Sequence, residues 1–142
     1  MIYTPMTKVA INFMFEKHKD LKDKSGLPYV FHPFHVAEQM DDEDSTIVAL
    51  LHDVVEDTDT TFDDLAALGF NQNVLDALRL LTHDPSIPYM EYIRKIKDNP
   101  LAKKVKIADL THNSDTSRLD VVDDKVLERV KKYKEALELL GK

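Results

Sequence analysis

The chain has 142 residues, of which 43% are hydrophobic and 32% are charged, and it carries a net charge of −7 at pH 7. This length suits one domain, 1–142, with a single core. The acidic balance argues against nucleic-acid binding, because no basic excess is available to displace phosphate counterions. The absence of cysteine excludes disulfides, thiolate zinc sites and a cysteine nucleophile. No apolar run is long enough to cross a bilayer and no secretory hydrophobic segment occurs, so we expect a cytoplasmic protein without a membrane partner.

Helical periodicity extends along the chain, which has only three glycines and no sustained strand-like alternation. We therefore predict an all-α fold, a compact single-domain bundle. The expected helices lie, in chain order, at about 7–19, 33–40, 44–55, 60–69, 73–82, 89–97, 100–118 and 124–140. The third is apolar on nearly every side, so it is expected to be the central buried helix. His18 and His83 lie near helix ends and are expected at the surface.

Ionisable residues interrupt this most apolar helix. His52 and Asp53 are adjacent in its middle, where each needs a partner to offset the cost of burial. At about 100° per residue, these two share an arc of roughly 140° with Glu56 and Asp57. Repulsion among the three carboxylates must be relieved by a cation, by protonation or by arginine. No lysine or arginine occurs between positions 24 and 79, so a metal ion is the simplest explanation.

A second polar group lies in the expected helix at 100–118. Asp109 sits between Ala108 and Leu110, in the apolar half of that helix. Asp109 forms one stripe with His112, Asn113 and Thr116 at spacings of three and four. A single aspartate in such a place is more often a structural carboxylate than a ligand.

A third polar group lies among aromatic residues at 29–37. His32 precedes Pro33, which biases the histidine towards an extended conformation just before the helix. His35 is an alternative ligand one turn later, and a lone histidine among aromatic residues is usually a core residue. Taken together, the three groups supply two imidazoles and two carboxylates, a set that suits Mn²⁺, Fe²⁺ or Zn²⁺ with open positions for water. The oxygen-rich surroundings favour the harder ions.

The order His … His-Asp … Asp is that of the HD-domain phosphohydrolase superfamily. Longer strings resemble the hydrolase domain of RelA/SpoT homologues, enzymes that remove the 3′-pyrophosphate from ppGpp and pppGpp. These strings are Lys24-Ser25-Gly26-Leu27-Pro28-Tyr29, His32-Pro33 with Val36-Ala37, Leu51-His52-Asp53-Val54-Val55-Glu56-Asp57-Thr58, and Val105-Lys106-Ile107-Ala108-Asp109 with His112-Asn113. With no synthetase or regulatory region in the sequence, the chain resembles a stand-alone small alarmone hydrolase.

The resemblance implies roles for individual residues and an HD-type helical bundle. The residues that would bind one Mn²⁺, or another divalent transition metal, are His32, His52, Asp53 and Asp109. Glu56 and Asp57 would be the catalytic carboxylates that order and activate water. The residues that would hold the small-molecule nucleotide are Lys24, Ser25, Tyr29, Asn113 and Thr116. A core aromatic role explains Tyr29 equally well.

Two positions depart from the family pattern. Asp23 stands where the family usually has an arginine packed on the guanine base, and Leu110 stands where a basic residue is usual. We therefore expect hydrolysis of a phosphorylated nucleotide, with ppGpp as the leading substrate. Another HD nucleotidase, with a different nucleotide substrate, is the main alternative. A non-catalytic nucleotide sensor would not need both Glu56 and Asp57, and structural metal sites tend to be closed and thiolate-rich. Nothing in the sequence predicts the oligomeric state.

Overall fold

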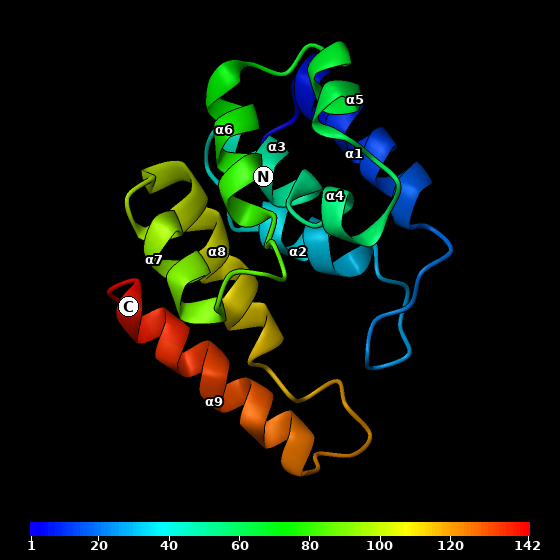
Figure 1. Ribbon diagram of the computed structural model, residues 1–142. Coiled ribbons are helices and arrows are strands. Elements are labelled where there is room, and N and C mark those ends of the chain that lie inside the picture. The colour runs from blue at the N-terminus through cyan, green and yellow to red at the C-terminus, as the bar shows by residue number, and fades with distance from the viewer.

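The computed structural model describes all of residues 1–142 and contains nine α-helices and no β-strand. In chain order the helices are α1 (Pro5–His18), α2 (Phe31–Glu38), α3 (Glu43–Leu51), α4 (Val54–Asp57), α5 (Phe62–Ala67), α6 (Gln72–Leu81), α7 (Tyr89–Lys97), α8 (Pro100–Asn113) and α9 (Asp124–Leu139) (Figure 1). The predicted all-α fold is confirmed. None of these helices is both long enough and apolar enough to pass through a bilayer.

Helix α3 lies at the centre of the bundle. It packs against α1, α2, α6 and α8, and its residues 45–51 are all buried. The helix begins after Asp42, whose carboxylate accepts a hydrogen bond from the Ser45 N–H at 2.8 Å, a cap of the kind that aspartate favours. The apolar residues of α3 thus lie in the core, and the polar residues His52 and Asp53, which follow the helix, lie at the edge of the core.

The helix expected at 44–55 is divided in two. Helix α3 ends at Leu51 with His52 as its C-cap, and α4 begins after Asp53, which has φ −107° and ψ 0°. The prediction of one continuous helix is therefore wrong here. Adjacent side chains on a straight helix point about 100° apart. The turn at His52 and Asp53 instead brings both side chains towards α2 and α8.

Three further expectations differ from the structure. Helix α2 begins at Phe31, so His32 lies within its first turn and is not extended; a proline is tolerated there because first-turn N–H groups have no helical partner. Helix α8 ends at Asn113, earlier than expected, where the Ser114 hydroxyl donates to the Leu110 carbonyl at 2.7 Å. His18, expected at the surface, is completely buried.

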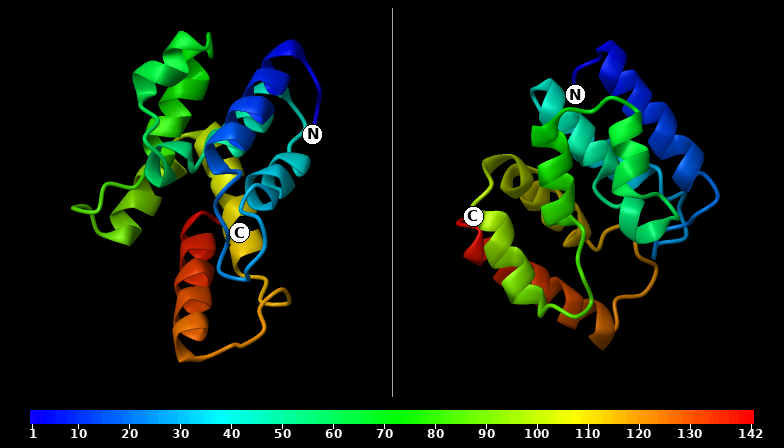
Figure 2. Two further views of the ribbon diagram at one scale, coloured as in Figure 1. Left: turned by 90° about the vertical axis from the view of Figure 1, so that its right-hand side faces the viewer. Right: turned by 45° about the horizontal axis from the view of Figure 1, so that its top comes forward.

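Two long loops meet on one side of the bundle. The loop that joins α1 to α2 covers residues 19–30, and the loop that joins α8 to α9 covers residues 114–123. The views in Figures 1 and 2 show these loops side by side, with α9 along α7 and α8 at the outside of the bundle. The loops and α9 therefore form one wall of any cavity that opens in front of α3 and α4.

Candidate metal centre

Four side chains that could hold a metal ion converge from three parts of the fold. They are His32 from α2, His52 and Asp53 from the turn between α3 and α4, and Asp109 from α8. One donor atom from each lies within 4.8 Å of the other three. The structure thus brings together the same four residues that the sequence nominated, while His35 lies outside the cluster.

The His52 ring is oriented for metal binding. Its Nδ1 lies 2.5 Å from the Ala49 carbonyl oxygen, so Nδ1 carries the proton and Nε2 has a free lone pair. Nε2 is buried without a hydrogen-bond partner, at 3.1 Å from Asp53 Oδ2 and 3.4 Å from Asp109 Oδ1. An unpartnered imidazole nitrogen facing two buried carboxylates fits a divalent cation.

The charges of the cluster lead to the same conclusion. Burial alone would lower the pKa of the His52 imidazole, but Asp53 and Asp109 raise this pKa well above its usual value. Burial alone would raise the pKa of Asp53, but His52 holds this pKa at about 2. A proton on His52 and a bound cation are thus competing ways to offset the two carboxylates.

His32 and Asp109 are held by residues around them. His32 Nε2 lies 2.8 Å from Asp109 Oδ1, and His32 Nδ1 lies 2.7 Å from His112 Nδ1. Burial lowers the pKa of His112 to about 4, so His112 is neutral near pH 7, and the two Nδ1 atoms share one hydrogen bond in which one ring donates and the other accepts. Such outer contacts fix the tautomer of a metal-binding histidine.

Lys106 contacts one of the four donors, a role that was not predicted from the sequence. Its ammonium group donates to Asp109 Oδ2 at 2.9 Å and lies 5.2 Å from the centroid of the Tyr92 ring. Burial alone would raise the pKa of Asp109, but Lys106 lowers this pKa well below the usual range. The spacing of three residues between Lys106 and Asp109 on one helix was the available signal. Asn113, expected to bind substrate, also donates to Asp109, at 3.0 Å.

Glu56 and Asp57 stand beside the four donors on α4 and are not part of the four-residue cluster. Glu56 accepts a hydrogen bond from the backbone N–H of His83. Burial, followed by the charge of Asp53, raises the pKa of Asp57 to about 6. Burial likewise raises the pKa of Glu56. Two carboxylates with raised pKa values next to a metal-binding cluster are suited to accept a proton from water.

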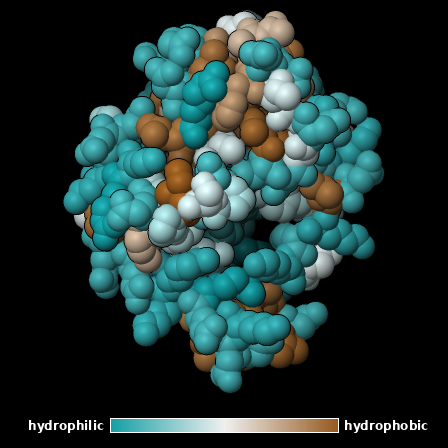
Figure 3. Space-filling view, in the orientation of Figure 1, coloured by the Kyte–Doolittle hydropathy of each residue, from teal (hydrophilic) through white to brown (hydrophobic).

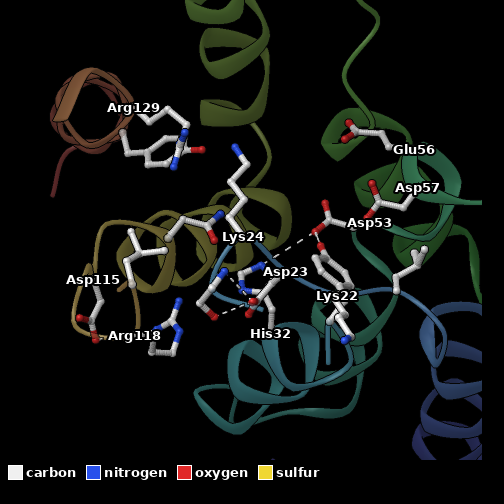
Figure 4. A pocket seen from close by; sticks show the side chains of 16 residues that line it. Lys22, Asp23, Lys24, His32, Asp53, Glu56, Asp57, Asp115, Arg118 and Arg129 are labelled. Atoms are coloured by element: carbon white, nitrogen blue, oxygen red, sulfur yellow. Dashed lines mark hydrogen bonds and ion pairs between the residues drawn. The ribbon is translucent and has the colours of Figure 1, made fainter. Parts of the chain in front are cut away.

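These residues open into a cleft of about 700 Å³ between α4 and the two long loops (Figure 4). Figure 3 shows a hollow on this face with mainly hydrophilic residues around it. The cleft is lined by Leu21, Lys22, Asp23, Lys24, Ser25, Tyr29, His32, Asp53, Glu56, Asp57, Asn113, Asp115, Arg118, Leu119, Arg129 and Tyr133.

The predicted substrate-binding residues fall unevenly around this cleft. Four of them line it, namely Lys24, Ser25, Tyr29 and Asn113. The Tyr29 hydroxyl donates a hydrogen bond to Asp53 Oδ2. Thr116 does not line the cleft, because α8 ends before it and the helical stripe from Asp109 is broken.

Two basic residues of the cleft, Arg118 and Arg129, were not singled out from the sequence. Arg118 lies in the α8–α9 loop and Arg129 on α9, and neither belongs to a motif with a recognisable spacing. Leu110 is completely buried in the core. Position 110 therefore does not face the cleft, and the leucine there does not remove a positive charge from the cleft.

Comparisons with known proteins agree with this geometry. No family model matches the chain. The chain is 38% identical over 117 residues to guanosine-3′,5′-bis(diphosphate) 3′-pyrophosphohydrolase MESH1 of Danio rerio, covering 73% of this chain and 64% of that protein. The corresponding enzyme of Aquifex aeolicus (strain VF5) is 34% identical over 119 residues, covering 75% of this chain and 17% of that protein. The chain thus spans less than two thirds of the length of the MESH1 relative and a small part of the bacterial one.

A solved structure gives a similar result. It is that of a metazoan ortholog of SpoT, described as hydrolysing ppGpp and playing a role in starvation responses. The TM-score is 0.77 at 26% sequence identity, over 99% of this chain and 88% of that one. The chain is thus similar in sequence to these ppGpp 3′-pyrophosphohydrolases, and in both sequence and fold to the metazoan ortholog of SpoT.

Proposed function

We propose that this protein is a metal-dependent hydrolase that removes the 3′-pyrophosphate of guanosine alarmones such as ppGpp. The observation that carries the proposal is the position of Glu56 and Asp57 next to the four converging donors, on the wall of the same cleft. The relatives named as ppGpp 3′-pyrophosphohydrolases support the choice of substrate. We propose Mn²⁺ as the ion, because a ligand set of two imidazoles and two carboxylates suits Mn²⁺ better than it suits a soft metal that prefers thiolate ligands.

A divalent cation bound at the four donors would polarise the attacked phosphate and lower the pKa of a water molecule. The chain's own groups supply the rest. Glu56, held by the His83 N–H, accepts the proton as the water oxygen attacks the phosphorus attached to the 3′-oxygen. The bond from phosphorus to the 3′-oxygen breaks, the proton held by Glu56 passes to the 3′-oxygen to restore the 3′-hydroxyl, and pyrophosphate leaves. Asp57, the next residue, helps Glu56 to orient the water molecule.

The basic residues of the cleft offset the charge of the substrate. Partial burial, followed by the charges of Arg129 and Lys132, lowers the pKa of Lys24, so three cations lie near one another. Two of them, Lys24 and Arg129, line the cleft. None of these three side chains forms an ion pair with a carboxylate. A polyphosphorylated nucleotide would supply the missing negative charge.

A hydrolase for a different nucleotide remains the second candidate, favoured by Asp23 at the position where the family usually has arginine. The experiment is to incubate the Mn²⁺-loaded protein with ppGpp, pppGpp and a panel of other phosphorylated nucleotides, and to measure pyrophosphate and orthophosphate release. We expect pyrophosphate from the two guanosine alarmones. Faster turnover of an unrelated nucleotide, with no pyrophosphate from ppGpp, would favour the second candidate.

A further inference from the structure

We propose that Asp23 and Arg118 form a guanine-reading pair, in which the carboxylate binds the N1–H and N2–H groups of the base and the guanidinium binds O6 and N7. The inference rests on the proposed function and deepens it, because it assigns the recognition of the base. Both side chains line the cleft that contains the metal donors. They come from the two loops that lie side by side, and Figure 4 shows Arg118 on the opposite side of this cleft from Glu56 and Asp57.

Asp23 presents one free oxygen on a fixed carboxylate. Its Oδ1 accepts three hydrogen bonds, from the Ser25 N–H at 2.9 Å, the Ser25 hydroxyl at 2.5 Å and the Leu27 N–H at 3.0 Å. Its Oδ2 accepts none from the protein. Because an ionised carboxylate has two acceptor oxygens, each with two lone pairs, the loop fixes the group through Oδ1 and leaves Oδ2 for a ligand.

Arg118 has unused donors on the other loop. Its Nε is buried and has no hydrogen-bond partner, and its nearest carboxylate oxygen, on Asp115, is 3.9 Å from Nη1. Burying an N–H without a partner costs free energy, so a ligand that accepts from this side chain would recover that cost.

The two groups are close but not paired. Burial alone would raise the pKa of Asp23, but the hydrogen bonds from Ser25 and Leu27 lower it, and the charge of Arg118 adds a smaller lowering effect. No nitrogen of Arg118 lies within 4.0 Å of an Asp23 oxygen. The two opposite charges lie on neighbouring loops and line the same cleft, and each side chain has a hydrogen-bonding edge that no protein group satisfies.

Guanine has the hydrogen-bonding edges that match this pair. Its O6 and N7 are adjacent acceptors that suit a bidentate arginine. Its N1–H and N2–H₂ are adjacent donors that suit a carboxylate oxygen. Adenine has an amino donor at position 6 and no hydrogen on N1. Its amino group would therefore face the donors of Arg118, and its N1 acceptor would face the acceptor oxygen of Asp23. The pair should therefore select guanine over adenine.

The test is direct binding of nucleoside 5′-diphosphates to the Mn²⁺-loaded chain, measured by calorimetry with GDP, ADP and XDP (xanthosine 5′-diphosphate). We expect GDP to bind at least about 10-fold more tightly than ADP, within the range of one good bidentate contact. Asp23→Asn keeps an oxygen to cap the loop and replaces the free oxygen with an amide donor. Xanthine carries an oxygen in place of the N2 amino group, so this variant should bind GDP more weakly and XDP more tightly, each by about 10-fold.

Two further variants separate base reading from general charge effects. Arg118→Gln should weaken GDP binding by about 10-fold without improving XDP binding. Asp115→Asn removes the same charge from the same cleft and should leave the ratio of GDP to XDP affinity unchanged. Equal binding of GDP and ADP by the unmodified chain, or an unchanged GDP to XDP ratio in Asp23→Asn, would overturn the pair.

Hydrolysis of ppGpp is measured in parallel, so the two proposals fail separately. Pyrophosphate release without base selectivity would overturn the guanine-reading pair and leave the proposed function standing. Selective GDP binding without pyrophosphate release would support the pair and contradict the hydrolysis.

Discussion

His18 Nε2 lies 3.7 Å from Asp57 Oδ2, which joins the end of α1 to the carboxylate beside the metal centre. His18 is completely buried, and neither of its ring nitrogens has a hydrogen-bond partner. Its ring also packs on Tyr29, with 4.9 Å between the ring centroids. Helix α1 thus packs behind the wall of the cleft that carries Asp57, through a histidine that belongs to no sequence motif.

This burial predicts a pH dependence of stability. Burial lowers the pKa of His18 from 6.5 to about 4, so between these values the unfolded chain binds more protons than the folded one. The free energy of unfolding should therefore fall as the pH drops from 6.5 towards 4, with about 3 kcal/mol at stake from this group. Urea unfolding of the metal-free protein at pH 7 and pH 5 measures the effect. His18→Phe keeps the ring and should flatten the dependence; an unchanged slope would contradict the assignment.

Loss of one donor should abolish metal binding. Because the four donors come from three separate segments, a bound ion would link α2, α8 and the α3–α4 turn and should raise the melting temperature. Asp53→Ala should remove both the bound metal and the increase in melting temperature. His35 lies outside the cluster, so His35→Ala is the control and should keep its metal. Metal content is measured on the purified variants, and a fully loaded, active Asp53→Ala protein would show that the centre is elsewhere.

Lys106 should influence the metal through Asp109. Replacing Lys106 with methionine leaves the Asp109 carboxylate without its cationic partner, and we expect metal affinity to fall by about 10- to 100-fold, as for other outer-sphere changes. Lys104 is on the same helix and pairs with Asp41 at the surface, so Lys104→Met is the matched control. Titration with a metal-competing chelator compares the two. Equal affinities would show that Lys106 does not support the site.

Glu56 should affect turnover more than metal binding. Glu56→Gln retains the size of the side chain and removes the proton acceptor, so we expect metal content to persist while kcat falls by about 10²- to 10⁴-fold. Steady-state kinetics and metal analysis on the same preparation check this. If the variant loses its metal, Glu56 is a ligand; if kcat is unchanged, Asp57 is the next candidate for the base.

The rate should also depend on the ionisation of the two carboxylates. The pKa of Asp57 is raised to about 6 by burial and then by Asp53 and Glu56. A base must be ionised to accept a proton, so the rate should decline as the pH falls through this region. A bound cation offsets part of the charge of Asp53, which places the decline at or below pH 6. A pH profile of kcat/KM that rises as the pH falls from 7 to 5 would be inconsistent with a carboxylate base.

The helices, and the four side chains that converge in the structure, could be predicted from the sequence for a clear physical reason. Apolar periodicity records which face of a helix is buried, and a histidine beside an aspartate within such a face, like His52 and Asp53, is costly without a partner. The break between α3 and α4 could not be read in this way, because it depends on where Asp109 and His32 lie in space. Arg118 and the burial of His18 were missed because they depend on loop positions and on packing. Lys106 was missed although its spacing of three residues from Asp109 on one helix was an available signal.

The central claim is that water attacks the phosphorus attached to the 3′-oxygen of a guanosine alarmone. The direct measurement is to incubate the Mn²⁺-loaded protein with ppGpp in ¹⁸O-labelled water and to analyse the products by mass spectrometry. We predict GDP and pyrophosphate in equal amounts, with one ¹⁸O atom in the pyrophosphate and none in the GDP. Release of orthophosphate, label in the nucleotide, or no reaction by the metal-loaded protein would contradict the account.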